Sequence, residues 1–382
     1  MDFSLSEEQQ LLKDSVDRFV RENYELDQRR TLVASDDGFS REHWKTMAEL
    51  GWLGVALPED FGGIDGGAVE TMVIAEAIGA GLVVEPYLPC VVLGGGMLLE
   101  AGSEAQKQEL LPKLAEGELM LAVAYAERQS RFDLHDVEFK AEKDGDGWVL
   151  NGHKGVVING PAADTLIVSA RTSGDSRDEN GITLFLVDAG AAGVERRNYP
   201  TVDGLRASEV TCSGVKVGAD AVLGEVDKGL AVLERGIERA IAAICAEAVG
   251  AMQVLLDSTN EYLKQRKQFG VPLSKFQVLQ HRMVDMFMET EQARSMALMA
   301  TLKVESDDAT ERRKAISAAK VQIGKSGRFV GQQAVQLHGG MGMTDELHIG
   351  HYFKRLTMID TMFGNHDHHL KRFAALSRDE AA

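Results

Sequence analysis

One carboxylate stands alone in a strongly apolar part of the chain. The segment Ala240–Leu256 reads AIAAICAEAVGAMQVLL, and Glu247 is its only charged residue. Burying an unpaired carboxylate is costly, and burial raises its pKa, which suits a general base that must accept a carbon-bound proton. The alternatives are an ion pair with an arginine of another helix and a position at a subunit boundary. Glu238 and Asp360, in more charged surroundings, are weaker candidates for the base.

A run of histidines near the C-terminal end suggests metal binding at first sight. His366–His369 reads HDHH, and imidazole and carboxylate groups are common metal ligands. Neighbouring residues point to different sides of a helix, however, so His368 and His369 would not converge on one ion. We therefore expect no metal site, but a polar helix start with exposed or hydrogen-bonded histidines.

A short basic segment follows the apolar stretch. Tyr262–Gly270 reads YLKQRKQFG and gathers Lys264, Arg266 and Lys267 before Phe269. Basic residues in the last helical turn and a glycine after it are typical of a helix C-terminus. Composition alone therefore favours a solvated basic helix end that stops at Gly270.

The glycine-rich sequences VVLGGGML and LHGGMGM lack the context of a dinucleotide-binding fold. No G-x-G-x-x-G follows a strand at the start of a helix, and there is no Walker A sequence and no G-x-S-x-G elbow. We therefore expect no Rossmann domain that binds a nicotinamide cofactor.

The elements that must position these residues follow the order α, β, α. Capping-box spacings at Ser6/Gln9 and Ser103/Gln106, and Ser40 before a segment that ends at Gly51, predict helices in residues 1–118. Alternating apolar residues and the hairpin signal DGDG predict strands in residues 119–225. Long periodic segments in residues 226–382 predict a helical bundle, with methionines as core filling; these are Met283, Met286, Met288, Met296 and Met299.

Composition limits the class of protein. The 382 residues are enough for two or three domains, and 44% of them are hydrophobic. A net charge of −18 argues against nucleic acid and anionic membranes as partners. Cys90, Cys212 and Cys245 have no metal-binding spacing, no signal-peptide pattern opens the chain, and no uninterrupted apolar run approaches the ~20 residues of a membrane span. We expect a cytoplasmic protein with reduced thiols.

Three motifs together resemble the acyl-CoA dehydrogenase family. They are YLKQRKQFGVPLSKFQVLQHRMVDM, AVQLHGGMGMTDE and GDGWVLNGHKGVVING, in an α–β–α order that covers essentially the whole chain. Within the family the chain is most similar to the small subunit of pimeloyl-CoA dehydrogenase, and to subunits of paired enzymes that act on steroid side chains. The resemblance implies an α+β, mostly α, fold with an N-terminal helical domain, a middle β-barrel-like domain and a C-terminal helical bundle.

The resemblance also implies a cofactor and a reaction. FAD lies between the β domain and the bundle in this family, and the enzyme introduces an α,β double bond into an acyl-CoA. A base removes the α-proton, the β-hydrogen leaves as hydride to flavin N5, and electrons pass to an electron-transfer flavoprotein. The cofactor supplies the redox chemistry while the protein aligns the thioester and the base.

Several cofactor contacts carry over to this sequence. Arg266 and Phe269 match family contacts to the FAD of a neighbouring subunit, and Gln277 fits the contact made by the following helix. Gln336, Gly339 and Gly340 match the glycine motif near the adenine and pyrophosphate. Arg266 is therefore expected to act across a subunit boundary, in a homotetramer or an α2β2 heterotetramer.

The β domain departs from the family pattern at two places. Ala126, Glu127 and Arg128 stand where Thr-Glu-Pro is common beside the flavin, and Val156, Val157 and Ile158 stand where Trp-x-Thr is common against its ring. The hydroxyl near N5 is thus missing. We assign Glu127, Val157 and Ile158 to the cofactor site, where FAD would bind through backbone groups and apolar packing; the alternative is a degenerate site.

Both usual positions of the base lack a carboxylate. Phe363 precedes Gly364 where many relatives have glutamate, and Ala240 occupies the other position, about ten residues before Gly250. Glu247 lies seven residues after Ala240, which is about two helical turns, so both residues share a face. We therefore expect Glu247 to be the base of an FAD-dependent acyl-CoA dehydrogenase subunit. The alternative is a non-catalytic or half-site partner subunit of a heteromeric enzyme.

Overall fold

The computed structural model describes residues 4–379 and divides the chain into two compact units. The helical unit consists of the chain up to Thr31, Ala68–Val83 and the chain from Ile241 onward. The sheet unit consists of Leu32–Gly67 and Val84–Ala240. The order of helices, sheet and helices along the chain confirms the predicted fold class.

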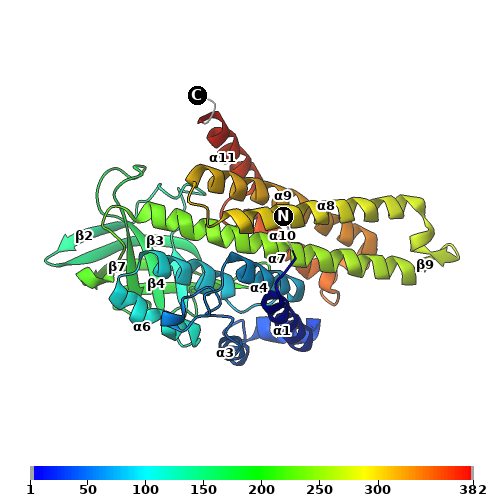
Figure 1. Ribbon diagram of the computed structural model, residues 1–382, viewed down its shortest axis with the longest axis horizontal. Coiled ribbons are helices and arrows are strands. Elements are labelled where there is room, and N and C mark those ends of the chain that lie inside the picture. Colours follow the sequence, from blue (N-terminus) through cyan, green and yellow to red (C-terminus); the bar gives the residue numbers. More distant parts are fainter. Residues whose placement is uncertain (1–3, 380–382) are drawn as a thin grey trace. The chain divides into compact units, whose positions relative to one another are not determined.

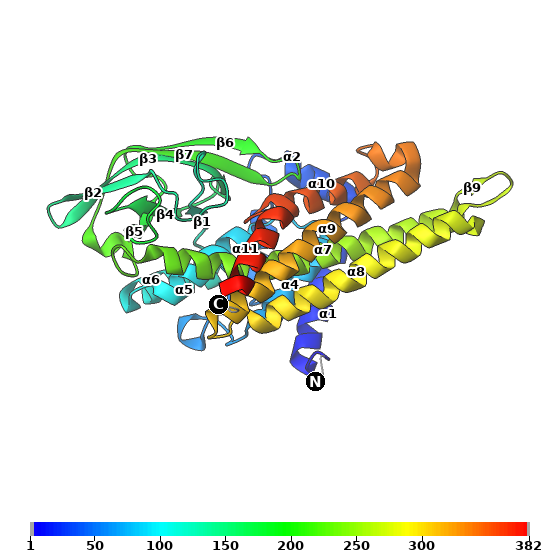
Figure 2. The ribbon, with the colours of Figure 1, turned by 90° about the horizontal axis from the view of Figure 1, so that it is seen from above.

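The helical unit is built on long helices. Figure 2 shows α8 and α9 side by side, and α10 and α11 also pack on α9. A two-stranded hairpin projects beyond the ends of α7 and α8 (Figure 1). Its elements are α1 (Glu7–Asn23), most of α2 (Leu26–Ala34), α4 (Ala68–Gly81), the longer part of α7 (Gly229–Gln265), β9 (Lys267–Gln268), β10 (Val271–Pro272), η4 (Leu273–Lys275), α8 (Gln277–Lys303), α9 (Ala309–His338), η5 (Gly339–Met343), α10 (His348–Thr361) and α11 (His366–Asp379).

The sheet unit carries one eight-stranded sheet. The strand order is β6-β7-β3-β2-β4-β5-β8, and β1 pairs with β4 in parallel. Its core is formed by alternating apolar residues such as Leu150, Leu166 and Val210. Its elements are α3 (Arg41–Glu49), η1 (Glu59–Phe61), the π-helix η2 (Tyr87–Gly95), α5 (Gly96–Ala101), α6 (Glu104–Ala115), β1 (Leu121–Ala124), β2 (Lys140–Asp144), β3 (Gly147–Ile158), β4 (Thr165–Arg171), β5 (Ile182–Asp188), β6 (Val194–Pro200), β7 (Arg206–Val217), η3 (Ala219–Ala221) and β8 (Val222–Leu223).

Local signals set many of the element ends. The Ser6 hydroxyl accepts a hydrogen bond from the Gln9 backbone N–H, and the Gln9 side chain accepts one from Ser6 N–H, so the capping box at α1 is confirmed. The equivalent box at Ser103 starts α6. β2 and β3 meet at the predicted DGDG hairpin, where Gly145 adopts φ +61°.

Two expectations about elements were wrong, and one strand has no sequence signal of its own. α7 ends at Gln265 and not at Gly270, because the chain turns into the hairpin and Phe269 adopts φ +54°. β6 lies inside the predicted strand region 119–225, but no apolar alternation marks it, because its residues are mostly exposed. Not all of the α8 methionines fill the core, since Met286 is buried but Met288 is 51% exposed.

The apolar stretch around Glu247 belongs to a core helix. α7 is the one helix among residues 4–379 that is long and apolar enough to cross a membrane, but 83% of its most apolar window is buried inside the protein. Its apolar character is therefore explained by packing against neighbouring helices. The three cysteines are free thiols and are all buried.

Candidate functional site

Glu247 lies in a buried ion pair. Arg355 of α10 donates from Nε to Glu247 Oε1 at 2.5 Å and from Nη2 to Oε2 at 2.9 Å. The side chains are only 6% and 7% exposed. Such two-pronged arginine–carboxylate bonds are strong and fix the orientation of the carboxylate. The geometry therefore favours the ion-pair alternative for Glu247 over a base.

Two glycines allow α4 to approach α7 at this point. A Cβ atom on Gly79 would lie 1.8 Å from the Glu247 carbonyl oxygen, and one on Gly250 would lie 1.9 Å from the Glu76 carbonyl oxygen. Backbone contact of this kind is possible only without side chains. The surroundings of Glu247 are thus closed by tight helix packing, in agreement with a structural role.

The turn between α10 and α11 holds the other usual position of the base. Phe363 adopts φ +57° and Gly364 φ +102°. The fully buried Lys320 ammonium donates to the carbonyl oxygens of Ile359, Asp360 and Gly364 at 2.8–2.9 Å, and burial lowers the pKa of Lys320 to about 8. The turn is therefore held in place, but it presents an aromatic ring where many relatives have a carboxylate. Ala240, at the second position, is fully buried.

The C-terminal histidines make hydrogen bonds inside the helical unit. His366 Nδ1 contacts both carboxylate oxygens of Asp360 at 3.0–3.1 Å. His369 Nε2 donates to the Phe363 carbonyl at 2.9 Å, and burial lowers the pKa of His369 to about 3. Among residues 4–379 no group of three or more His, Cys, Asp or Glu side chains is placed to hold a metal ion. Asp360, a weaker candidate for the base, is occupied by His366.

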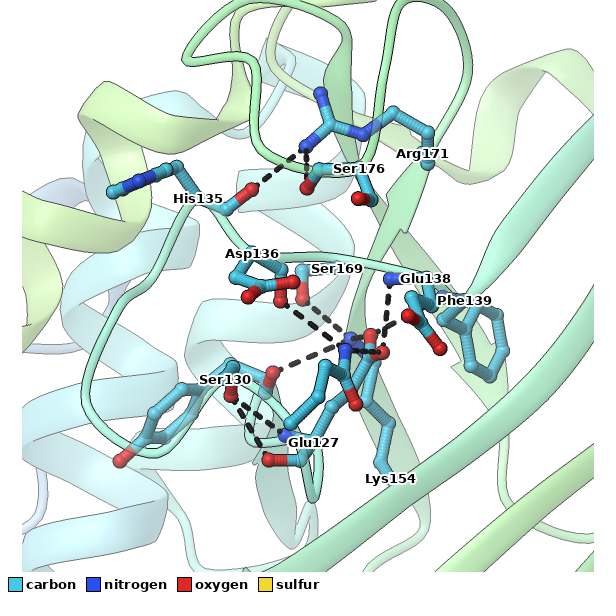
Figure 3. Close-up of polar contacts among 12 residues, drawn as sticks. Glu127, Ser130, His135, Asp136, Glu138, Phe139, Lys154, Ser169, Arg171 and Ser176 are labelled. Atoms are coloured by element: carbon cyan, nitrogen blue, oxygen red, sulfur yellow. Dashed lines mark hydrogen bonds and ion pairs between the residues drawn. The ribbon is translucent and has the colours of Figure 1, made fainter.

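In the sheet unit, the Glu127 carboxylate is buried and surrounded by hydrogen-bond donors (Figure 3). It accepts hydrogen bonds from Lys154 Nζ at 2.6 Å, from the backbone N–H groups of Glu138 and Phe139 at 2.9 and 3.2 Å, and from Gln129 at 2.7 Å. Burial raises the pKa of Glu127, but the charge of Lys154 and the hydrogen bonds outweigh this and hold it below its usual range. The carboxylate therefore fixes a loop. The assignment of Glu127 to the cofactor site, where FAD would bind through backbone groups and apolar packing, stays a prediction.

The second departure from the family pattern lies in β3. Val157 is fully buried and belongs to the core of the sheet unit, and its assignment to the cofactor site stays a prediction. The neighbouring Val156 is 54% exposed and adopts φ +50°, a strained conformation for a β-branched residue. Ile158 is half-buried. The exposed apolar surface at this place thus belongs to Val156, which the sequence analysis did not assign to the site.

The basic segment lies on the projecting hairpin and at the start of α8. Phe269 is 92% exposed and touches Phe276 edge-on, with ring centroids 6.1 Å apart. Arg266 and Gln277 are exposed. The Arg266 guanidinium has no hydrogen bond or ion pair within residues 4–379.

The glycine motif caps the end of α9. Gln336, Gly339 and Gly340 are exposed, and Gly339 adopts φ +61° and ψ −142°, a conformation that favours glycine. A Cβ atom on Gly339 or Gly340 would meet no atom within 4 Å, so their backbone is open to a ligand.

These groups fit FAD. An accessible, unpaired guanidinium suits a pyrophosphate, an exposed aromatic ring suits a flat heterocycle, and open glycine backbone allows close approach of a nucleotide. In the helical unit, the residues that would hold it are Arg266, Phe269, Gln277, Gln336, Gly339 and Gly340. Sequence reasoning missed Lys154 and Arg171, whose buried contacts order the Glu127 loop, because neither lies in an expected cofactor position.

Comparison with known proteins identifies the family. Models of the N-terminal, middle and C-terminal domains of acyl-CoA dehydrogenases match residues 6–118, 122–215 and 227–376. The chain belongs to the acyl-CoA dehydrogenase family. It is accordingly an oxidoreductase that acts on CH–CH bonds of acyl-CoA thioesters with FAD as cofactor.

Similar proteins cover nearly the full length of the chain. A probable acyl-CoA dehydrogenase, YngJ, from Bacillus subtilis is 32% identical over 91% of both chains. The structure of the steroid ACAD Tcur3481-Tcur3483 is 31% identical, with a TM-score of 0.89 and 99% coverage of both chains. The ChsE4-ChsE5 complex from Mycobacterium tuberculosis is 27% identical, with a TM-score of 0.88, and covers 100% of this chain and 99% of that one.

Proposed function

We propose that this protein is an FAD-dependent subunit that introduces an α,β double bond into an acyl-CoA and passes the electrons to an electron-transfer flavoprotein. The observation that carries the proposal is the unpaired, accessible Arg266 guanidinium next to the 92% exposed Phe269 on a projecting hairpin. Both groups are built to contact something outside this helical unit. Bound FAD would supply the hydride acceptor, while the chain binds and orients the thioester.

A second observation, on α8, supports an oligomer. Val284, Phe287 and Met288 lie on one face of α8 and are each more than half exposed. Exposed apolar side chains gathered on one helix face are typical of a protein–protein interface. We propose that α8 and the hairpin contribute to a subunit interface, in a homotetramer or an α2β2 heterotetramer.

A second candidate is a partner subunit with an incomplete site. Phe363 and Ala240 provide no carboxylate, and Glu247 is held by Arg355. The Tcur3481-Tcur3483 and ChsE4-ChsE5 structures carry paired names, which supports a heteromeric assembly for a similar chain. In this candidate the base comes from another chain. We further propose that the enzyme is cytoplasmic and that its thiols are reduced. The proposed domains span residues 1–118, 119–225 and 226–382. We also propose that the chain is related to the small subunit of pimeloyl-CoA dehydrogenase.

The decisive test is anaerobic bleaching of the bound flavin. The protein is purified alone and after co-expression with a second acyl-CoA dehydrogenase chain of its organism, and each sample is mixed with short, branched, dicarboxylic and steroid acyl-CoA thioesters. We expect a yellow oligomer whose 450 nm band falls with one class of substrate. Bleaching of the protein alone supports the catalytic subunit, and bleaching only after co-expression supports the partner subunit.

Arg266→Ala tests whether the unpaired guanidinium binds FAD. Lys264→Ala, near the same helix end, is the matched control. Lys264 is paired with Glu261 at 2.7 Å and is therefore not free for a ligand. Only the Arg266 variant should lose FAD during gel filtration. Equal flavin content in both variants, or a flavin-free wild-type protein in every preparation, would contradict the proposed function.

A further inference from the structure

A hollow of about 550 Å³ opens on the surface of the sheet unit. This is within the ~300–1,000 Å³ typical of ligand pockets. Its lining residues are Glu127, Arg128, Gln129, Glu138, Phe139, Gly152 and His153. Five of these seven residues come from the segment Glu127–Phe139, which we call the 127–139 loop. The shape of the hollow therefore depends on how this loop is held.

One carboxylate joins the two ends of the 127–139 loop. Glu127, at its start, accepts from the backbone N–H groups of Glu138 and Phe139, at its end. Glu127 also exchanges hydrogen bonds with the Ser130 hydroxyl at 2.9 and 3.2 Å. Lys154 fixes the carboxylate from β3 and donates to Ser169 of β4 at 2.9 Å. A compact loop with joined ends is the form that functional surface loops commonly take.

Arg171 holds the distal part of the same loop (Figure 3). Its side chain is buried at the end of β4, and its guanidinium donates to the carbonyl oxygen of His135 at 2.7 Å. Its two terminal nitrogens also donate to the loop between β4 and β5, residues 172–181. The acceptors there are the carbonyl oxygens of Ser176, Asp178 and Asn180, at 2.7–2.9 Å. A planar guanidinium can bridge four carbonyl groups in this way, whereas an ammonium group cannot.

Further contacts join the two loops but do not replace this bridge. Val137 N–H donates to the Ser176 carbonyl at 2.8 Å, and Arg177 pairs with Asp136 at 3.1 Å. Arg177 is 77% exposed, so its ion pair is weak in water. Arg171 is thus the one buried cation among the described residues that bonds both loops at once.

We propose that Arg171 is a positioning residue for cofactor binding, because it preforms the 127–139 loop as one wall of the FAD site. The inference rests on the proposed function and on the resemblance to the family, which implies that Ala126–Arg128 lies beside the flavin. Arg171 itself touches no ligand, since its terminal nitrogens are bound to backbone carbonyls. Arg128 and Glu138 in the hollow have no side-chain partner within residues 4–379, so they face the ligand with free polar groups.

The test compares FAD affinity with loop order in the full-length protein. Flavin is removed from wild type, Arg171→Met and Arg171→Lys, and the dissociation constant for FAD is measured by fluorescence titration. Hydrogen exchange of residues 128–137 and the melting temperature are recorded on the same samples. If the ordered loop falls to a tenth of the population, the dissociation constant should rise about tenfold. Arg171→Lys should be intermediate, and the visible circular dichroism of bound flavin should change in both variants.

Arg197→Met is the matched control, because Arg197 is a 73% exposed arginine of β6 paired with Glu209. It should bind FAD like the wild type. Faster exchange of the loop with an unchanged dissociation constant in either Arg171 variant would overturn the inference, as would a lower melting temperature as the only effect. If Arg171→Met does not fold, Arg171→Lys decides on the same criteria. Wild type that binds no FAD would refute the proposed function itself, and this is visible before any variant is compared.

Discussion

The two units each bury one acidic–basic pair, but the two pairs are built differently. In the helical unit Glu247 and Arg355 face each other with two parallel bonds, and they join α7 to α10. In the sheet unit Lys154 contributes only one of four bonds to Glu127, because the backbone of Glu138 and Phe139 and the Gln129 side chain supply the others. The first pair connects two helices, whereas the second orders a loop.

This difference shows how the same chemistry can serve distinct ends. A carboxylate that depends on one arginine becomes an uncompensated buried charge when the arginine is lost. A carboxylate that also accepts backbone N–H groups keeps most of its hydrogen bonds after its lysine is lost. Stability of the helical unit should therefore depend on its pair more strongly than stability of the sheet unit depends on Lys154.

The largest effect should come from Arg355→Met. It leaves the Glu247 carboxylate buried among tightly packed helices, and loss of one partner of such a pair typically costs about 3–5 kcal/mol. Urea denaturation followed by far-ultraviolet circular dichroism measures this loss. The double variant Glu247→Met, Arg355→Met should recover much of it, because no buried charge remains.

Glu247→Gln separates the structural role from the catalytic one. If Glu247 serves mainly as a partner of Arg355, the variant should lose stability while the rate of flavin reduction per bound flavin changes little. A variant as stable as wild type that reduces its flavin ~10²–10⁴ times more slowly would restore Glu247 as the base and break the comparison.

A smaller effect is expected from Lys154→Met. Glu127 keeps its bonds to Glu138, Phe139 and Gln129, so the loss should be about 1.5–3 kcal/mol, as for one hydrogen bond to a charged group. Trp148 of β3 makes tryptophan fluorescence a suitable probe. Lys216→Met is the matched control, because its exposed ion pair with Asp144 should not shift the denaturation midpoint. A Lys154 loss as large as that of Arg355→Met would contradict the comparison.

The smallest effect is a difference in acid sensitivity. Burial lowers the pKa of His369 from 6.5 to about 3, and also lowers the pKa values of His338, His348 and His351. Below pH 6.5 these histidines therefore bind more protons in the unfolded chain than in the folded helical unit, so the free energy of unfolding decreases as the pH decreases. For His369 alone the decrease is on the order of 1 kcal/mol at pH 5.5. The lowered pKa of Glu127 gives the sheet unit the same sign, but only as pH falls below about 4.5.

Two probes can follow this difference in one sample. Trp44, Trp52 and Trp148 all belong to the sheet unit, so tryptophan fluorescence reports on that unit, while circular dichroism at 222 nm is dominated by helices. Between pH 6.5 and 5 the denaturation midpoint by circular dichroism should fall more than the midpoint by fluorescence. Coincident shifts would mean that the two units unfold as one.

Local sequence signals predicted the elements but not the directions of key side chains. Helix caps and tight turns depend on neighbouring residues in the chain, so they could be predicted from the sequence. These are the caps at Ser6, Ser40 and Ser103 and the DGDG turn. The register shift between Lys154 and Val157 in the β3–β7 pairing changes which side chains face the core, so simple alternation could not predict that Val157 is buried and Val156 exposed.

Partners that lie far apart in the sequence could not be predicted from the periodicity of apolar residues. An ion pair was one of the alternatives for Glu247, but its partner Arg355 lies 108 residues away. Glu127 was expected to face a cofactor, and only folding brings Lys154, 27 residues later, beneath it. The hairpin after Gln265 was read as helix because its charged residues continue the pattern of a helix end, and the left-handed Phe269 has no sequence signature.

The buried cysteines can serve as built-in probes of local unfolding. Burial raises the pKa of Cys212 to about 11 and those of Cys90 and Cys245 to about 12, so the folded chain holds little thiolate at neutral pH. An alkylating reagent can therefore modify these thiols only after the surrounding structure opens. Cys90 and Cys212 belong to the sheet unit, and Cys245 belongs to the helical unit. After brief alkylation, the order in which the peptides that contain these cysteines gain mass shows which unit opens first. No added label is needed for that measurement.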